Sequence, residues 1–284
     1  MFSGVITALV TPFKKNKQID YNALQKLLDY QILNNIKNIL ILGTTGESCT
    51  IDFYEREKLI KFTKNYLPSN CKLIVGTGTN NLQQTIKNTI QAKTLGADAC
   101  LVVAPYYNKC TQNGVVDYYK KISQLNIPYI VYNVPSRTGF NISPVTMLKL
   151  CKQKNMVGIK EANSNIEHIL EVFNKVGNFT NIYCGNDNLN HIFFSLKAKG
   201  TISVISNIFP YQISQSLKSA KNSKIITEQN FELTKLLFVE PNPIPIKYAL
   251  SKMGLIKNYV RSPLTTLSKK YKNKINQELK KRGL

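Results

Sequence analysis

The feature that most constrains the fold is a regular alternation of short apolar runs with longer amphipathic segments. Such alternation is typical of βα units, in which parallel strands lie buried beneath helices. Eight units match a closed barrel rather than an open doubly wound sheet. We therefore predict an α/β protein with a (β/α)8 TIM barrel. The apolar runs are Val5–Leu9, Ile39–Leu42, Leu73–Val75, Ala99–Val103, Tyr129–Tyr132, Val157–Ile159, Ile182–Cys184 and Thr201–Val204.

The segments between these runs predict helices on the outside of the barrel. Strand signals stop after about Pro210, and the remainder of the chain has the pattern of helices interrupted at Pro241–Pro245, where three alternate prolines favour an extended break. We expect a catalytic barrel over residues 1–223 and a small helical C-terminal domain over residues 224–284. The predicted helices are Tyr21–Leu33, Asp52–Tyr66, Leu82–Leu95, Val115–Gln124, Pro144–Cys151, Ile166–Val176 and Asn190–Lys197.

Length and composition limit the class of protein. A chain of 284 residues fits one barrel with an addition. No run of about 18 apolar residues occurs, and the first residues lack a basic segment followed by an apolar stretch. We therefore expect a soluble cytoplasmic protein, with no membrane span and no signal peptide.

The formal net charge of +22 would suit a protein that binds nucleic acid. However, only four of the 38 basic residues are arginines, which are favoured where phosphates or base edges are read. The lysines are scattered over the predicted outer helices. We therefore treat the charge as incidental and expect no nucleic-acid partner.

Cysteine and histidine give little material for a metal site. The six cysteines show no Cys-x-x-Cys spacing, so neither a zinc ribbon nor a small disulfide framework is predicted. The only histidines, His168 and His191, fall on separate predicted helices. We expect reduced thiols, no metal site and no His-based catalytic triad.

The sixth apolar run, Val157–Ile159, is followed directly by Lys160. Burial disfavours the ammonium form of lysine, and the neutral amine is the form that attacks a ketone to give a Schiff base. Lys160 is therefore our candidate nucleophile. The alternative is that Lys160 extends from a strand end to water. Position alone favours that alternative, so the choice between the two interpretations depends on the residues at the other strand ends.

The site of such a barrel lies at the C-terminal ends of the strands. After the second run, the glycines of Gly43–Gly46 frame two hydroxyls in a turn that would suit a small carboxylate, although most such turns bind nothing. Tyr106, Tyr107 and Tyr132 stand at the fourth and fifth strand ends, where a phenol can transfer protons or simply pack. Arg137 follows the fifth. With the lysine, these residues converge on one rim.

On these residues the chain resembles the Schiff-base aldolase family that includes N-acetylneuraminate lyase and dihydrodipicolinate synthase. The resemblance extends from Phe2 to Lys247. Thr44-Thr45, Tyr106-Tyr107-Asn108 and Ser136–Gly139 resemble the dihydrodipicolinate synthase branch, because sialic acid lyases usually carry a serine in the first motif and lack the arginine. The motifs in family order are Gly43-Thr44-Thr45-Gly46-Glu47, Tyr132-Asn133-Val134-Pro135 and Gly158-Ile159-Lys160-Glu161.

The resemblance implies roles for four catalytic residues. Lys160 would form the imine with pyruvate, and Tyr132 would pass protons during imine formation and carbon–carbon bonding. Thr45 would link Tyr132 to Tyr107 of a neighbouring subunit and so complete a proton relay. The active unit would then be at least a dimer.

The resemblance also implies a substrate pocket. Thr44 and Thr45 would hold the pyruvate carboxylate, and Gly185 and Ile202 would shape the pocket around it. Arg137 would receive the carboxylate of the second substrate through its planar, bidentate donors.

The activity implied is that of a lyase that condenses pyruvate with aspartate 4-semialdehyde through a lysine Schiff base. The product would be 4-hydroxy-tetrahydrodipicolinate, on the way to diaminopimelate and lysine. No cofactor is implied, and the enzyme would be a homotetramer built as a dimer of dimers. Two alternatives stay open. One is another 2-keto acid aldolase of the family, such as N-acetylneuraminate lyase, and the other is a non-catalytic, basic nucleic-acid-binding protein.

Lysine-sensitive relatives bind lysine in a cleft at the dimer interface, and the resemblance places several residues there. Gln84 stands where sensitive enzymes have a glutamate for the inhibitor's ammonium group, and Phe53 and Arg56 stand where they have histidines. We therefore predict weak or absent inhibition by lysine. The expected cleft residues are Ser48, Cys49, Phe53, Arg56, Asn80, Gln84 and Tyr106.

Overall fold

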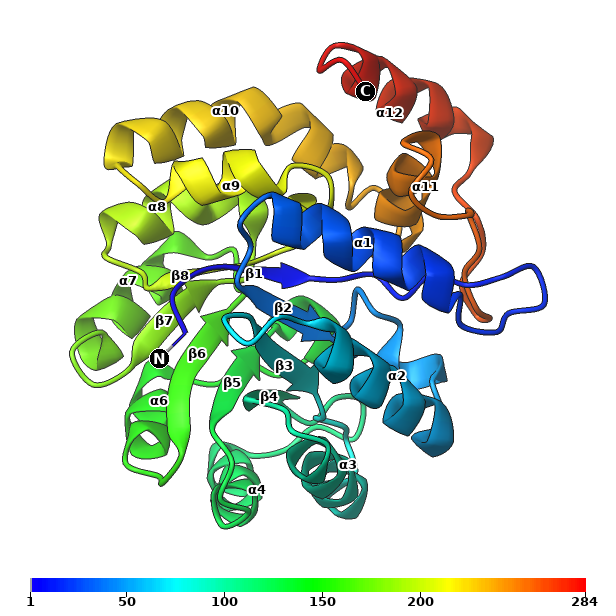
Figure 1. Ribbon diagram of the computed structural model, residues 1–284. Helices are drawn as coiled ribbons and strands as arrows, with labels where there is room; N and C mark the ends of the chain where they lie inside the picture. Colours follow the sequence, from blue (N-terminus) through cyan, green and yellow to red (C-terminus); the bar gives the residue numbers. More distant parts are fainter. Residues whose placement is uncertain (1) are drawn as a thin grey trace.

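The computed structural model describes residues 2–284. Eight parallel strands of this part of the chain pair in sequential order, and the last pairs with the first, so the sheet closes into a barrel (Figure 1). The predicted TIM barrel is confirmed. The strands are β1 (Gly4–Ala8), β2 (Asn38–Ile41), β3 (Lys72–Gly76), β4 (Ala99–Val103), β5 (Tyr129–Asn133), β6 (Met156–Glu161), β7 (Asn181–Cys184) and β8 (Gly200–Ser203).

Helices surround the barrel (Figure 1). Most begin at a side-chain cap; in α4, for example, Thr111 accepts a hydrogen bond from the Gly114 N–H, so the helix starts three residues before the predicted Val115. The helices around the barrel are α1 (Tyr21–Leu33), α2 (Phe53–Tyr66), α3 (Leu82–Thr94), α4 (Gln112–Ser123), α5 (Pro135–Thr138), α6 (Pro144–Cys151), α7 (Ile166–Val176) and α8 (Asn190–Ser195).

Side chains on alternate positions of the strands build two apolar layers. The outward-facing ones pack against the helices in one large core. The inward-facing ones, among them Ile6, Leu40, Ile74, Ile130 and Ile202, fill the barrel. The barrel is therefore a packed core, and a ligand is expected at its C-terminal rim.

The C-terminal part is helical, as predicted: α9 (Pro210–Ser216), α10 (Ala220–Leu236), α11 (Ile244–Lys252) and α12 (Lys269–Lys280). The predicted break at Pro241–Pro245 is too long, because α11 already begins at Ile244. Pro245 lies in the first turn of that helix, where its missing N–H removes no helical hydrogen bond. The expected domain boundary between residues 223 and 224 lies inside α10, and the division there stays a prediction.

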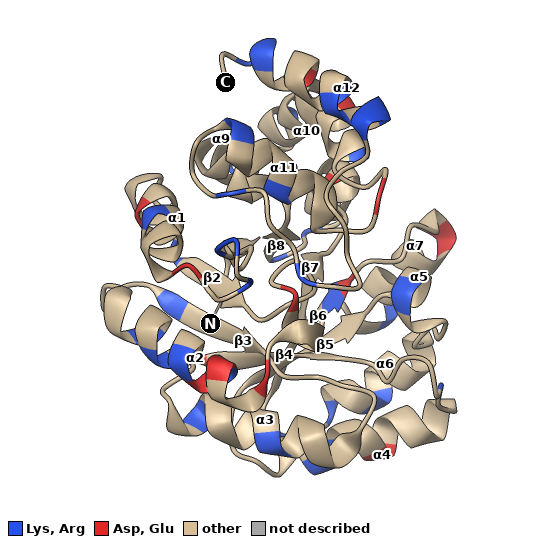
Figure 2. Ribbon diagram, turned by 90° about the vertical axis from the view of Figure 1, so that its right-hand side faces the viewer, with Lys and Arg blue, Asp and Glu red and all other residues tan. Residues whose placement is uncertain are grey.

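Basic residues are spread over the outer helices, with several on α12 (Figure 2). Within residues 2–284 no helix is long and apolar enough to cross a membrane. In the same residues no three His, Cys, Asp or Glu side chains gather as a metal-binding group would require.

Candidate active site

A cavity of about 680 Å³ lies at the C-terminal rim of the barrel. Lys160 and Tyr132 come from neighbouring strands, Thr44, Thr45 and Gly185 join them from strand-end loops, and Arg137 comes from α5. These six predicted site residues therefore share one space. The cavity is closed on one side by Lys235, Phe238, Val239, Pro241 and Asn242 of the C-terminal part.

Lys160 lies next to Tyr132 in the lining of this cavity. The two residues are register partners on β6 and β5. The Lys160 Nζ atom is 4.3 Å from the centroid of the Tyr132 ring, and both side chains are buried. Lys160 therefore does not reach out to bulk water, and the alternative of a lysine that extends from the strand end is wrong.

The absence of a side chain at Gly185 is required by the segment that carries Lys160, above all by Ala162. A Cβ atom there would lie 3.1 Å from Lys160 Cε and 2.8 Å from Ala162 Cβ. Ile202, also predicted to shape the pocket, is buried in the layer beneath the cavity, and Val204 on the same segment lines the cavity instead.

The loop after β2 brings Thr44 and Thr45 to the cavity. Thr45 Oγ1 accepts a hydrogen bond of 2.9 Å from Asn242 Nδ2. The backbone carbonyl of Asn242 also accepts a hydrogen bond of 3.2 Å from Arg137 Nη2. Asn242 thus contacts two predicted site residues, and its own Oδ1 is buried without a partner among the described residues.

A buried ion pair anchors the far end of this loop. Glu47, whose φ of +54° is uncommon for a non-glycine residue, pairs with Lys247 of α11 and also accepts from the Arg261 N–H at 2.9 Å. Burial lowers the pKa of the Lys247 ammonium to about 8, although Glu47 opposes the shift. Removing either partner would leave a buried charge uncompensated, so the pair joins the loop firmly to the C-terminal helices.

Asp187 lies fully buried after β7. Its Oδ2 accepts hydrogen bonds from the backbone N–H groups of Val204 and Ile205, at 2.8 and 3.0 Å. Burial raises the pKa of the Asp187 carboxyl, while these hydrogen bonds and the charge of Lys160 oppose the shift. The carboxylate fixes the end of β8 beside the cavity.

Tyr107, the remaining predicted catalytic residue, lies outside the cavity. Its side chain is 91% exposed and its φ is +70°, which places the ring on the surface. Neighbouring Tyr106 is half-buried in a second cavity of about 310 Å³, and burial raises the pKa of its hydroxyl to about 12. One chain alone does not bring Tyr107 to Thr45.

The predicted lysine cleft is brought together only in part. Ser48, Cys49 and Tyr106 line the second cavity. Arg56 is instead buried, and its Nη2 donates to the Gly76 carbonyl at 2.8 Å, so its guanidinium is turned into the protein. The remaining cleft residues, Phe53, Asn80 and Gln84, are absent from the lining of that cavity.

Several residues that line the main cavity were not predicted from the sequence. Asn186 and Asn188 follow β7 and could have been found by the strand-end rule, as could Ser136 after β5. Asn242 and Lys235 could not have been found in this way, because they belong to the C-terminal helical part, which has no strands.

Comparison with known proteins places this geometry in a family. The model of the dihydrodipicolinate synthetase family matches residues 1–282. The chain is 45% identical to the 4-hydroxy-tetrahydrodipicolinate synthase of Thermosipho africanus, with all of both chains covered. It is 43% identical to the enzyme of the same name from Fervidobacterium nodosum, over 100% of this chain and 99% of that one.

A solved structure agrees with these relatives. The crystal structure of dihydrodipicolinate synthase from Acinetobacter baumannii, complexed with pyruvate, is similar with a TM-score of 0.97. The two are 37% identical over 100% of this chain and 99% of that one. The expected synthase activity is thereby confirmed, and the sialic acid lyase alternative is not favoured. The chain belongs to the dihydrodipicolinate synthetase family.

Proposed function

We propose that Lys160 forms a Schiff base with pyruvate and that the resulting enamine condenses with aspartate 4-semialdehyde to give 4-hydroxy-tetrahydrodipicolinate. The observation that carries the proposal is the buried Lys160 amine, 4.3 Å from the Tyr132 ring in a cavity that also holds an arginine. A buried amine next to a phenol can act as a nucleophile with a proton carrier beside it. No cofactor takes part in the reaction as proposed.

The chemistry proceeds on Lys160. The neutral amine adds to the ketone carbon of pyruvate, and loss of water gives the imine. The imine draws electrons from the adjacent methyl carbon, which loses a proton and becomes the nucleophile that attacks the aldehyde. The amino group of the second substrate then attacks the imine carbon and displaces the Lys160 amine. This step closes the ring and frees the enzyme. Tyr132 carries protons in these steps, and Thr44 and Thr45 hold the pyruvate carboxylate.

The proposal includes a homo-oligomer in the cytoplasm. Tyr107 is exposed on a loop and does not reach Thr45 of its own chain. A second copy that placed its Tyr107 beside Thr45 would complete the proton relay, so we propose a dimer as the smallest active unit and a tetramer of two dimers as the assembly.

A substrate panel tests the function. The enzyme should consume pyruvate only together with aspartate 4-semialdehyde, and it should release no pyruvate from N-acetylneuraminate. Cleavage of the sugar acid at a rate similar to the condensation would contradict the proposal.

Replacing Arg137 with Ala should affect the second substrate most. Arg137 lines the cavity from α5, whereas Lys160 lines it from the end of strand β6. Loss of a charge-assisted hydrogen bond of roughly 1.5–3 kcal/mol corresponds to about a 10- to 150-fold effect. We expect a fall of this size in kcat/KM for aspartate 4-semialdehyde, with little change for pyruvate. Equal weakening toward both substrates in steady-state assays would count against the role.

Lysine should inhibit this enzyme weakly. Gln84 offers a neutral amide, already donating to Asn88 Oδ1 at 2.8 Å, where a carboxylate would be needed to bind the ammonium group of lysine. Loss of such a contact removes roughly 1.5–3 kcal/mol, a large part of the about 4 kcal/mol that a 1 mM site has. We expect half-inhibition of the condensation only above about 1 mM lysine. Half-inhibition at or below that concentration would show that the cleft still works.

A further inference from the structure

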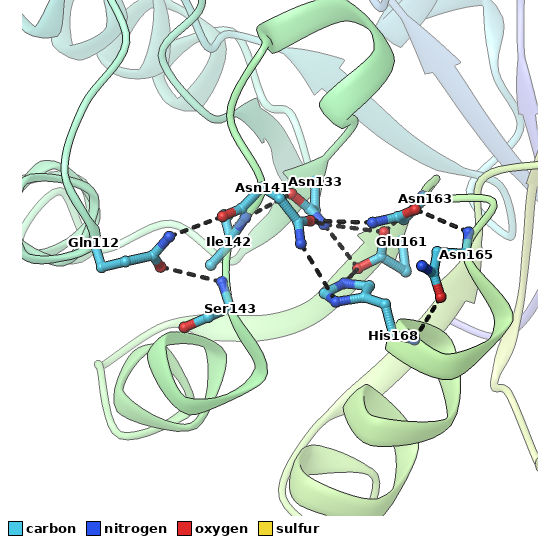
Figure 3. Close-up of polar contacts among 9 residues, drawn as sticks. All are labelled: Gln112, Asn133, Asn141, Ile142, Ser143, Glu161, Asn163, Asn165 and His168. Carbon is cyan, nitrogen blue, oxygen red and sulfur yellow. Dashed lines mark hydrogen bonds and ion pairs between the residues drawn. The ribbon is translucent and has the colours of Figure 1, made fainter.

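A buried polar cluster lies behind the two strands that carry Lys160 and Tyr132 (Figure 3). We call it the Glu161 cluster. Its members are Asn133, Asn141, Glu161, Asn163 and His168. Successive residues of a strand face opposite sides, so Tyr132 and Lys160 face the cavity while Asn133 and Glu161 face outward, beneath the helices.

The Glu161 carboxylate is fully buried, and both of its oxygens are occupied. Oε1 accepts from the Asn163 backbone N–H at 2.7 Å and from Asn133 Nδ2 at 3.0 Å. Oε2 accepts from Asn133 Nδ2 at 2.9 Å and lies 3.3 Å from His168 Nε2. A carboxylate with this many donors is held in one position.

One backbone N–H sets the direction of the hydrogen bonds that run from Asn133 through Asn141 to His168. The Ile142 N–H donates to Asn133 Oδ1 at 3.1 Å, so Asn133 Nδ2 must point to Glu161 and to Asn141 Oδ1. Asn141 Nδ2 then faces His168 Nδ1, 3.4 Å away, and that ring nitrogen must accept. The remaining ring nitrogen carries the proton and donates to Glu161.

The cluster is joined to the catalytic strands through the backbone. Asn133 pairs with Glu161 in the rung next to the pair Tyr132 and Lys160. The Asn133 carbonyl accepts from the Ala162 N–H at 3.0 Å, and the Glu161 carbonyl accepts from the Gly185 N–H at 2.8 Å. The ends of β5, β6 and β7 are thus tied together one residue beyond the nucleophile.

We propose that Glu161 is a positioning residue, which holds the ends of β5 and β6 so that the Lys160 amine and the Tyr132 hydroxyl keep the geometry that imine chemistry needs. The inference rests on the proposed function. Small errors in such geometry have large effects on rate, whereas substrate binding at Thr44, Thr45 and Arg137 does not depend on it.

Replacing Glu161 with Gln tests the proposal, because the two side chains have nearly the same volume and differ in charge and in hydrogen-bonding groups. The amide N–H₂ would face the Nε2–H of His168, and the ring cannot move its proton to Nδ1 because Asn141 donates there. We expect kcat to fall about 10- to 100-fold, as a misplacement of up to about 1 Å would produce. The KM values for both substrates should change little. Borohydride trapping of pyruvate should slow in proportion to kcat.

A second substitution should restore the geometry. In the double variant Glu161→Gln, Asn141→Asp, the aspartate accepts from His168 Nδ1–H, so His168 Nε2 can accept from the new amide. The His168 ring is then matched again on both sides, although Asn133 Nδ2 still faces the new amide nitrogen and the negative charge has moved. We expect kcat to recover part of its loss. Should Glu161→Gln fail to fold, His168→Leu removes the 3.3 Å contact to Glu161 and the 3.4 Å contact to Asn141. The hydrogen bonds from Asn133 and Asn163 to Glu161 stay, so the fall in kcat should be smaller.

The matched control is Thr7→Val on the opposite side of the barrel. The Thr7 side chain also faces outward from its strand and is buried, and its hydroxyl donates to Gln31 Oε1 at 2.7 Å. Thr7 does not belong to the lining of the catalytic cavity. We expect Thr7→Val to lower Tm without lowering kcat. A folded Glu161→Gln enzyme with unchanged kcat would overturn the inference. So would a Thr7→Val enzyme whose kcat falls as much as that of Glu161→Gln when the two variants lose the same amount of Tm. If the unchanged enzyme traps no pyruvate at Lys160, the proposed function itself fails.

Discussion

Replacing Lys160 with Ala should abolish condensation and borohydride trapping of pyruvate. The amine is the only group proposed to form a covalent bond with substrate, and its removal leaves the cavity with no electron sink for the methyl carbon. Loss of a covalent nucleophile can lower kcat by up to roughly 10⁶-fold. Steady-state condensation assays would measure this, with binding of pyruvate to the variant followed separately.

The control for this substitution is Lys72→Ala. Lys72 is an exposed strand residue that pairs with Asp98 at 3.0 Å. Removing it changes the charge of the protein by the same amount and should leave condensation intact. A Lys160→Ala enzyme that kept more than a small fraction of its activity would exclude Lys160 as the nucleophile.

Replacing Tyr132 with Phe should lower kcat by about 10²- to 10⁴-fold, the range of a lost general acid or base. The ring would still pack beneath Lys160 Nζ, so the shape of the cavity is retained and only proton transfer is lost. We expect imine trapping and carbon–carbon bonding both to slow, because both need protons to move. Rapid-quench trapping and steady-state assays would compare the two steps.

Tyr129→Phe is the matched control on the same strand. Tyr129 faces outward and its hydroxyl donates to Gln153 Oε1 at 3.0 Å, away from the cavity. Its loss should lower stability with little change in kcat. If Tyr132→Phe behaved like Tyr129→Phe, the hydroxyl of Tyr132 would have no part in proton transfer.

The barrel could be predicted from the sequence because each strand carries its own apolar run. The run Val157–Ile159, for instance, lies within β6 (Met156–Glu161). Short elements carry a weaker signal. The four residues of α5 are fewer than two turns, so no helical period is visible there. The start of α11 was missed because Pro245 was interpreted as part of a break, although proline is also common in the first turn of a helix.

The candidate site was predictable where residues follow strands and unpredictable where distant segments meet. Lys160, Tyr132 and Arg137 all stand at strand ends and share the cavity as predicted. Asn242 reaches Thr45 from 197 residues away, and no local pattern marks such a contact. Glu161 belongs to a predicted motif, but its burial beneath the helices became visible only once the register of β5 and β6 was known.

The buried lysines Lys160 and Lys247 allow a direct test of the central claim. Both are almost fully buried, and burial lowers the pKa of the Lys247 ammonium to about 8, so Lys247 is a second buried amine that could compete for pyruvate. Of these two lysines, Lys160 lines the main cavity, whereas Lys247 is paired with Glu47.

The decisive measurement is peptide mass mapping after borohydride reduction in the presence of pyruvate. We predict one reduced pyruvyl group per chain, located on Lys160. A label on Lys247, or labelling spread over many lysines, would contradict the assignment of Lys160 as the nucleophile.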